Sequence, residues 1–265
     1  MPTTDPVPAS RHAIAAQLRA AGCIFAEDEA RLLIDAAPTP DALTAMVDER
    51  AAGVPLEHVV GWAEFCGLRI AVDPGVFVPR RRTEFLVRTA VGAAPPHGAV
   101  VADLCCGSGA VGAALAVALR SAGVYAVDVD PAAVRCARRN LAAAGGRVYE
   151  GDLYEPLPAS LRGRVDVLVA NVPYVPTGEI GMMPPEARLH EPPVALDGGA
   201  DGLDVLRRVA AGAPAWLAPG GRLLIETSER QAPPAVEAYS RSGLAPRVTS
   251  DDESNTAVVI GERPE

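Results

Sequence analysis

Residues suited to holding a planar amino group follow an apolar strand in the middle of the chain. Residues 166–170 form a short, largely β-branched run that predicts a buried strand. Asn171, Val172, Pro173 and Tyr174 follow it and supply an amide, two backbone carbonyls and an aromatic ring. Ligands of open α/β sheets bind beyond the carboxyl ends of the strands. The segment therefore predicts a substrate clamp, with a plain Asn-x-Pro turn as the alternative.

A glycine-rich turn follows an earlier strand. Residues 99–104 predict that strand, Gly107, Gly109 and Gly112 have the spacing G-x-G-x-x-G, and an alanine-rich helix runs to about Arg120. Glycine at these places permits a tight turn, close approach of a ligand and close packing of the helix on the strand. Because a glycine turn alone is a weak signal, the acids that follow it decide its meaning.

Acidic residues end the next two strands. Asp128 ends a strand over 124–128, 21 residues after Gly107, where its carboxylate can accept hydrogen bonds from two ribose hydroxyls. Asp152 follows a strand over 147–149 and can accept from an adenine amino group, with an ordinary turn acid as the alternative. These acids favour a cofactor that contains adenosine.

Two cofactor classes fit a glycine turn and a ribose acid, namely the nicotinamide dinucleotides and S-adenosylmethionine. The second has no pyrophosphate to be held at a helix N-terminus, and its sulfonium cation tolerates acidic surroundings. Asn171 and the residues after it supply the acceptors that a substrate with a planar NH2 group requires.

Length and charge limit the class of protein. The chain has 265 residues, of which 49% are hydrophobic, which suffices for one large domain or a domain with a smaller one. Its 24 basic and 33 acidic residues give a formal charge of −9, which argues against a protein whose main task is to bind nucleic-acid phosphates. We expect a monomer that binds neither nucleic acid directly nor a membrane.

The cysteines and the N-terminus indicate a cytoplasmic protein. Five cysteines are scattered without a C-x-x-C pair, which favours neither a disulfide framework nor a zinc site (Cys23, Cys66, Cys105, Cys106 and Cys136). The first ten residues show no signal-peptide pattern, and no apolar run approaches the roughly 18 residues of a membrane span. We expect reduced thiols and no metal.

The first third of the chain predicts helices and then short strands. Helices are expected from a Ser10 cap through Leu18, over 26–37, and from an Asp41 cap through Ala51. Glycines and prolines then punctuate β-prone pieces, which predicts a hairpin-like linker; the pieces are 68–72 and 76–78. The expected domains are an N-terminal helical substrate-recognition domain over 1–53, a β-hairpin linker over 54–80 and a catalytic domain over 81–265.

Three arginines precede the first helix of the catalytic domain, which is expected from Phe85 to about Val91. Positive charge is unfavourable at a helix N-terminus, so Arg80, Arg81 and Arg82 call for an anionic partner, with simple solvation as the alternative.

The rest of the chain predicts a closing sheet. Asp130, beside Pro131, fits a helix cap. Helices are expected over 204–213 and 234–242, a strand over 222–226, and an antiparallel pair of 247–249 with 257–260. The order of elements predicts a doubly wound α/β domain of about seven strands.

Nearly the whole chain resembles the release-factor glutamine methyltransferases of the HemK or PrmC type. Besides the glycine loop, the matching motifs are Gly61 and Phe65, Pro79-Arg80 with Thr83-Glu84, the segment 191–203 (EPPVALDGGADGL), and Leu217 to Gly221 before a strand. The resemblance implies a class I S-adenosylmethionine-dependent methyltransferase with a Rossmann-like seven-stranded sheet. It implies methylation of the side-chain amide nitrogen (N5) of a glutamine in a protein, with a release factor as the candidate substrate and S-adenosylhomocysteine as product.

The resemblance also implies roles for residues at the strand ends. The cofactor-binding residues would be Asp103, Cys105, Cys106, Gly107, Ser108, Gly109, Asp128, Val129, Asp152, Leu153 and Asn171. The substrate-binding residues would be Arg80, Thr83, Glu84, Asn171 and Tyr174. Asn171 would offer its side-chain oxygen and Val172 its carbonyl to the substrate amide, Pro173 would shape the turn, and Tyr174 would pack on the amide plane, which makes these four the catalytic residues.

Three departures from the family pattern indicate a divergent branch. Val172 stands where the family usually has proline, 227–231 is more polar than the usual turn, and Asn255-Thr256 replaces a common arginine. Two alternatives therefore stay open. One is methylation of another planar amino group, in nucleic-acid adenine or a small metabolite, and the other is a non-catalytic protein that binds S-adenosylmethionine.

Overall fold

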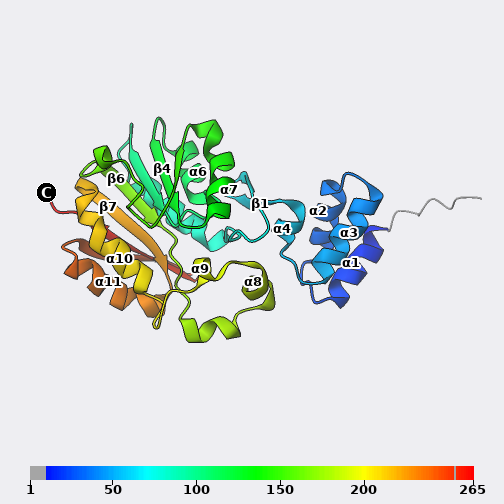
Figure 1. The fold of residues 1–265 in the computed structure, drawn as a ribbon. Coiled ribbons are helices and arrows are strands. Elements are labelled where there is room, and N and C mark those ends of the chain that lie inside the picture. The colour runs from blue at the N-terminus through cyan, green and yellow to red at the C-terminus, as the bar shows by residue number, and fades with distance from the viewer. Residues whose placement is uncertain (1–9, 254) are drawn as a thin grey trace, which may run out of the picture.

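A seven-stranded sheet with helices on both faces forms the larger part of the molecule (Figure 1). The computed structural model describes residues 10–253 and 255–265; the N-terminal residues expected to lack a signal peptide lie mostly outside them. The strand order is β5-β4-β3-β6-β7-β9-β8. The strands are β3 Val100–Leu104, β4 Gly123–Asp128, β5 Arg147–Glu150, β6 Val165–Ala170, β7 Leu217–Thr227, β8 Ala245–Asp251 and β9 Thr256–Glu262.

Five strands run parallel and two close the sheet in antiparallel fashion. β5, β4, β3, β6 and β7 are parallel neighbours, whereas β9 pairs antiparallel with both β7 and β8. Leu104 pairs with both Val127 and Ala170, and Ala170 pairs with Ile225. The carboxyl ends of four strands therefore meet at one edge, as the predicted doubly wound sheet requires.

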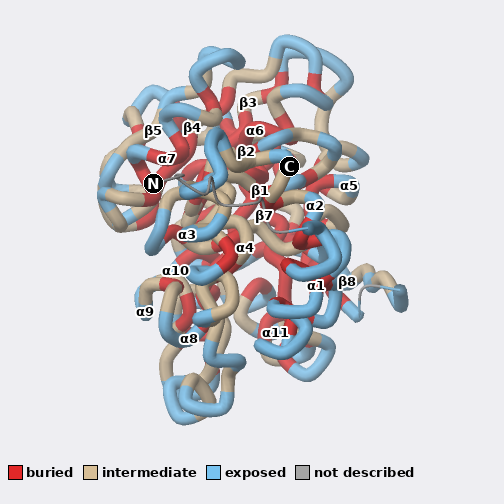
Figure 2. Tube along the Cα trace, turned by 90° about the vertical axis from the view of Figure 1, so that its right-hand side faces the viewer, coloured by how far each residue is buried: buried red, intermediate tan, exposed pale blue. Residues whose placement is uncertain are grey.

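Each face of the sheet packs against its own helices, because alternate residues of a strand point to opposite faces. Val167 and Val169 join the core beneath α5, α6 and α7, while Leu168 and Ala170 join the core beneath α10 and α11. The helices are α5 Glu84–Ala93, α6 Ala110–Ala118, α7 Pro131–Leu141, α10 Asp204–Gly212 and α11 Ala232–Arg241. In Figure 2 the buried segments concentrate within the molecule and the exposed ones in its outer turns.

The N-terminal helices have a core of their own. They are α1 Arg11–Ala20, α2 Ala26–Ala36, α3 Pro40–Ala51 and α4 Leu56–Val60. Ile14, Leu18, Leu33 and Val47 are buried together there, and Val60 of α4 packs against them. The expected division into three domains stays a prediction, but α4 packs with the helices although it falls in the expected linker.

The caps of these helices were predicted correctly at one site and wrongly at another. The Ser10 hydroxyl accepts a hydrogen bond from the backbone N–H of Ala13, as expected. At α3 the cap is Thr39, whose hydroxyl accepts from the N–H of Ala42, and not Asp41. Pro40 lacks an N–H and fits the first helical position, so the helix begins two residues earlier than predicted.

The linker is a hairpin, but its strands pair differently from the prediction. β1 Trp62–Phe65 pairs with β2 Leu68–Ala71 around a two-residue turn, where Cys66 and Gly67 have φ values of 51° and 72°. Two positive φ angles are the mark of a type I′ hairpin turn. Residues 76–78 form no strand, and Val76 and Val78 are buried in the same core as Val167 and Val169.

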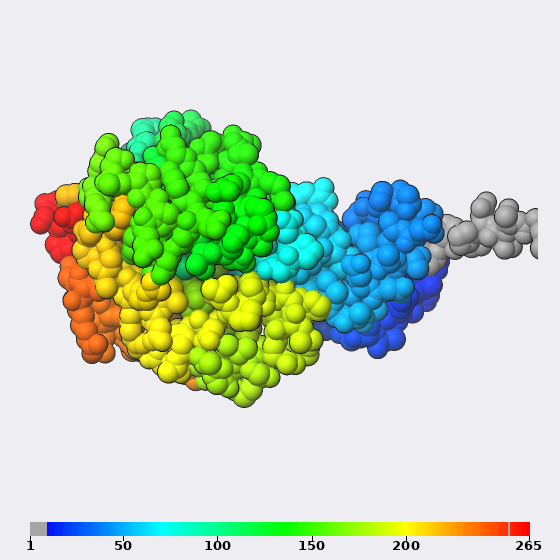
Figure 3. All heavy atoms as spheres, in the orientation of Figure 1, coloured from blue at the N-terminus to red at the C-terminus, as the bar shows by residue number. Residues whose placement is uncertain are grey.

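A long excursion between β6 and α10 lies across the carboxyl edge of the sheet. It contains η4 Thr177–Met182, α8 Pro185–His190 and α9 Pro193–Leu196. In Figure 3 this yellow-green and yellow segment covers the lower part of the molecule and reaches the blue N-terminal helices. Arg50 Nη1 lies 3.5 Å from Glu186 Oε1 at that contact.

The remaining helical elements are short. They are the 3-10 turns η1 Arg81–Thr83, η2 Ala142–Ala144, η3 Ala159–Leu161, η5 Ala213–Ala215 and η6 Glu229–Gln231. Among the helices of the described residues, none has both the length and the apolar character needed to cross a bilayer.

Candidate active site

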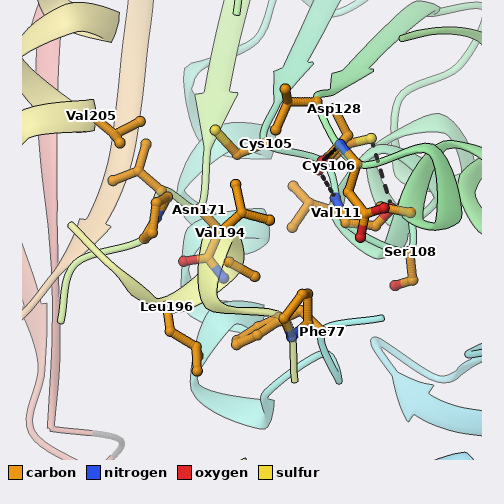
Figure 4. A pocket seen from close by; sticks show the side chains of 18 of the residues that line it. Phe77, Cys105, Cys106, Ser108, Val111, Asp128, Asn171, Val194, Leu196 and Val205 are labelled. Carbon is orange, nitrogen blue, oxygen red and sulfur yellow. Dashed lines mark hydrogen bonds between the residues drawn. The ribbon is translucent and has the colours of Figure 1, made fainter. Parts of the chain in front are cut away.

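A cavity of about 320 Å³ lies at the carboxyl ends of β3, β4 and β6. Figure 4 shows Asp128 and Ser108 on one side of it and Asn171 and Leu196 on the other. Most residues predicted to bind the cofactor or the substrate line this cavity: Arg80, Thr83, Asp103, Cys105, Cys106, Gly107, Ser108, Asp128, Val129, Asp152, Leu153, Asn171, Val172, Pro173 and Tyr174. The predicted residues Gly109 and Glu84 are not among its lining residues.

The glycine loop has the backbone shape that its spacing predicted. Gly107 and Gly109 have φ values of 55° and 77°, a conformation that side chains disfavour. A Cβ on Gly107 would meet nothing within 4 Å, so this loop leaves open space at the cavity wall. A Cβ on Gly109 would lie 3.0 Å from the Cβ of Ala137, so Gly109 permits close packing on α7 rather than contact with the cavity.

Asp103 ties the first strand to the helix after the loop. Its Oδ2 accepts a 2.8 Å hydrogen bond from the backbone N–H of Gly112, and a Cβ on Gly112 would lie only 2.9 Å from that oxygen. The side chain is buried, and this burial raises the pKa of Asp103 to about 7, although the Gly112 N–H opposes the shift.

Asp128 ends β4 and holds the glycine loop from the other side. Its Oδ2 accepts from the Gly107 N–H at 2.8 Å and its Oδ1 from the Asp130 N–H at 2.9 Å. Burial raises the pKa of Asp128, and the backbone N–H groups oppose this shift. Asp130 caps α7 by accepting from the Ala132 N–H, as predicted.

Asp152 lines the cavity together with a basic residue that the sequence did not indicate. Arg208 Nη2, from α10, lies 2.5 Å from Asp152 Oδ2. Leu153 beside it has a φ of 49° and is buried. Nothing in the sequence around Arg208 distinguishes it from an ordinary surface residue of a helix.

Neither cysteine of the loop has the character of a nucleophile. Burial raises the pKa of both the Cys105 and the Cys106 thiol, and the nearby carboxylates raise it further. The part of the chain that the structure describes contains no group of three or more His, Cys, Asp and Glu placed to hold a metal.

Asn171 presents an unused acceptor. Its Oδ1 is buried and has no hydrogen-bond partner among the described residues, which is costly unless a ligand supplies one. Val172 after it is 2% exposed and packs into the core beneath α10. The Tyr174 carbonyl accepts from Gln231 Nε2 at 2.9 Å, which anchors the loop at its far end.

Two of the three arginines before α5, Arg80 and Arg82, find anionic partners within the chain. Arg80 Nη2 donates to Glu191 Oε1 at 2.6 Å, and Arg82 Nε donates to Glu226 Oε1 at 3.0 Å. Both acids are buried. Glu191 belongs to the excursion after β6 and also accepts from the Val78 N–H, so this pair joins the linker to the rim of the cavity.

The two residues after these arginines differ in their surroundings. Thr83 is buried, lines the cavity and has an Oγ1 without a partner among the described residues. Glu84 accepts from the Cys66 N–H at 2.9 Å and so holds the hairpin turn. Glu84 was predicted to contact the substrate; it is not among the residues that line the cavity.

Sequence patterns did not single out several apolar lining residues. Phe77, Met183, Val194, Leu196 and Val205 come from the linker, the excursion and α10. They share no periodicity, and only the chain path brings them together, so no local signal was available.

Comparison with known proteins places these features in context. Residues 67–183 match the family described as "Methyltransferase small domain". A release factor glutamine methyltransferase of Geobacter sulfurreducens is 41% identical over 229 residues, covering 84% of this chain and 79% of the relative. A 4-amino-L-phenylalanine/4-methylamino-L-phenylalanine methyltransferase of Streptomyces pristinaespiralis is 37% identical, with the same coverage.

Solved structures support the fold. A methyltransferase from Pyrococcus furiosus has a TM-score of 0.56 at 17% identity, covering 75% of this chain and 90% of that one. A ribosomal protein L11 methylase from Lactobacillus delbrueckii has a TM-score of 0.53 at 17% identity, covering 74% and 86%. At these identities the likeness concerns the fold alone.

The buried Asp103 carboxyl gives a prediction for stability against pH. Its pKa is 3.8 in the reference state and about 7 in the folded protein, so the folded state favours the protonated form. The contribution of Asp103 is complete below the lower value and is lost as the pH rises to the higher one. We expect the free energy of unfolding of the wild type, relative to Asp103→Asn, to fall between those two pH values.

Denaturant unfolding at a series of pH values measures this difference. The asparagine of the Asp103→Asn variant retains an oxygen for the Gly112 N–H, and Asp41→Asn, at an exposed residue of α3, controls for loss of an acidic charge. A difference that stays constant or rises with pH would contradict the assignment.

Proposed function

The chain belongs to the family of release factor glutamine methyltransferases, and on this premise we propose that it methylates the side-chain amide nitrogen of a glutamine in a release factor. It is an S-adenosylmethionine-dependent methyltransferase. The observation that supports a substrate with a planar NH2 group is the buried Asn171 Oδ1, an acceptor without a partner among the described residues at the cavity wall. Membership of the family supports glutamine as the group that carries it.

The residues around the cavity fit S-adenosylmethionine, the cofactor of the family. Asp128 provides a carboxylate at the end of β4, and the absence of a side chain at Gly107 leaves room beside it. We assign Asp128 to the ribose hydroxyls and Asp152 to the adenine amino group. When bound, the cofactor would supply an electrophilic methyl carbon on a sulfonium; the nitrogen–methyl bond would form as the carbon–sulfur bond breaks, the sulfur would leave as a neutral thioether, and the nitrogen would release one proton.

The substrate end of the cavity has to activate a poor nucleophile. The lone pair of an amide nitrogen is delocalised, so the protein must fix the nitrogen and favour positive charge on it. Asn171 Oδ1 accepts one substrate N–H and the Val172 carbonyl accepts the other, while Tyr174 packs against the amide plane. These two acceptors hold the nitrogen in the orientation that attack requires.

A second candidate substrate is a small aromatic amine. The relative from Streptomyces pristinaespiralis is named for 4-amino-L-phenylalanine, whose amino group is attached to a flat ring. Phe77, Val194 and Leu196 give this cavity apolar walls that suit such a ring. The same two acceptors would serve either NH2 group, so the clamp alone does not choose between them.

The proposed substrate also suggests a cellular compartment, an oligomeric state and a role for the N-terminal helices. We propose that the enzyme acts in the cytoplasm as a monomer, that the N-terminal helices help to position the substrate protein, and that it does not bind nucleic acid directly. The free cysteines of the described chain support a reducing compartment.

A transfer assay distinguishes the two substrates. The purified protein is incubated with methyl-labelled S-adenosylmethionine and either a bacterial release factor or 4-amino-L-phenylalanine. We expect label in the release factor, at a glutamine side chain identified by tandem mass spectrometry. Label only in the aromatic amine would replace the first proposal with the second, and binding of the cofactor without any transfer would exclude both.

Substitutions at two strand ends should separate the chemistry from cofactor binding. Asn171→Ala removes one of two acceptors and should lower kcat by about 100-fold or more while leaving the affinity for S-adenosylhomocysteine nearly unchanged. Asp128→Ala should chiefly weaken that affinity. Asn255→Ala, in the exposed β8–β9 turn, is the matched control. Full turnover by Asn171→Ala would rule out the clamp.

Val172→Pro tests the position where the chain departs from the family pattern. Proline keeps the carbonyl and restricts the backbone, so kcat should be unchanged or higher. Steady-state kinetics with the methylated substrate measures this. A large loss of kcat with an unchanged melting temperature would show that Val172 belongs to a pocket of a different shape.

A further inference from the structure

A buried acid lies beside the proposed clamp. Ala170 pairs with Ile225 in the parallel sheet, so Asn171 and Glu226 occupy the next positions of neighbouring strands. Glu226 is 3% exposed, and only one of its carboxylate oxygens, Oε1, has a partner among the described residues. That partner is Arg82, which belongs to η1.

Arg82 connects this acid to the aromatic residue of the clamp. Its Nε donates to Glu226 Oε1 at 3.0 Å, and its Nη2 donates to the Tyr174 hydroxyl. The guanidinium carbon lies 5.8 Å from the centroid of the Tyr174 ring. Arg82 and Tyr174 both line the cavity. One planar side chain therefore joins η1, the end of β7 and the loop after β6.

The contribution of these contacts to the free energy of folding does not explain why Arg82 and Glu226 are placed here. Positive charge is unfavourable at the N-terminus of α5, and an ion pair with a buried member gives little net stabilisation. The second oxygen of Glu226 is buried without a partner among the described residues, which is a further cost. Arg88 of α5, whose side chain is 60% exposed, pairs with Asp251, whose side chain is 22% exposed; Arg88 does not line the cavity, and this pair has no fully buried member.

The geometry of the cation supports a role in orientation. Guanidinium presents its N–H groups in a rigid fork, so bonds from Nε and Nη2 fix the plane of the group relative to Glu226. The Tyr174 hydroxyl is then held at a set position, and its ring cannot rotate away from the cavity without breaking that bond. Burial raises the pKa of Tyr174, which keeps the hydroxyl protonated at neutral pH.

We propose that Arg82 is a positioning residue, which Glu226 holds in place and which fixes the Tyr174 ring against the plane of the substrate NH2 group. The inference rests on the proposed function, because it assigns Tyr174 to the substrate. It requires no contact between Arg82 and the reacting atoms.

Kinetics of four variants test whether Arg82 acts through Tyr174. Arg82→Met and Tyr174→Phe should each lower kcat/KM for the methyl acceptor by about 10- to 100-fold, the range expected for one hydrogen bond to a charged group. The double variant should be no worse than the less active single variant, because both changes remove the same link. Arg88→Met, the matched control, should be unchanged, and all variants should bind S-adenosylhomocysteine within about twofold of the wild type.

Arg82→Lys separates orientation from charge. A lysine ammonium keeps the positive charge near Glu226 but lacks the planar fork, so its kcat/KM should remain reduced. Full activity with lysine, independent multiplicative losses in the double variant, or an equal loss of cofactor affinity would each overturn the positioning role.

A spectroscopic measurement tests the inference without any methyl transfer. The chain has five tyrosines, and 3-fluorotyrosine labelling gives a fluorine resonance for each, with Tyr174 assigned from Tyr174→Phe. Arg82→Met should shift and broaden that resonance, and Arg88→Met should leave it unchanged. An unchanged Tyr174 resonance in Arg82→Met would overturn the inference. Wild-type inactivity toward both candidate substrates would instead reject the proposed function.

Discussion

The parallel register of β3, β4, β6 and β7 is the constraint on which the site depends. It brings the ends of four strands to one edge, so Asp128, Asn171 and Glu226 lie level with one another along that edge although they are far apart in the chain. Polar side chains at these positions are desolvated when helices cover the sheet. Each then needs a hydrogen-bond partner, either within the protein or in a bound ligand. At the cavity, the side-chain oxygen of Asn171 has no hydrogen-bond partner among the described residues.

Two carboxylates show how that loss of water is offset. Asp103 and Asp128 accept backbone N–H groups from Gly112 and Gly107, on either side of the same turn. Glycine is required at residue 112 because a Cβ there would lie 2.9 Å from the Asp103 oxygen. The acids thus fix the shape of the loop, and the loop in turn compensates the buried acids. Contacts within the chain therefore fix the glycine loop and its two acids relative to one another.

Local signals predicted most of the residues that line the cavity, but not the ion pairs that join its rim to distant parts of the chain. The strands, the glycine turn, Asp128 and the Asp130 cap depend on residues close together in sequence, where spacing is informative. The pairs Arg82–Glu226 and Arg80–Glu191 join residues 144 and 111 positions apart. The sequence indicated only that the arginines needed anionic partners. The pairing of β1 with β2 was missed because residues 76–78 are also apolar and resemble a strand in sequence, although they pack into the core without forming one.

In the proposed clamp, Val172 would act through its backbone rather than through its side chain. The side chain is 2% exposed and belongs to the core beneath α10, so it is committed to packing. The group assigned to the substrate is the carbonyl, which valine and proline share. A change of substrate is therefore more readily achieved at the rim, where Tyr174 is held by Arg82 and where the excursion after β6 is attached through Glu191 to Arg80. The specificity of this chain should accordingly be set by these two arginines and the segments that they hold, while the acceptors at the end of β6 stay the same.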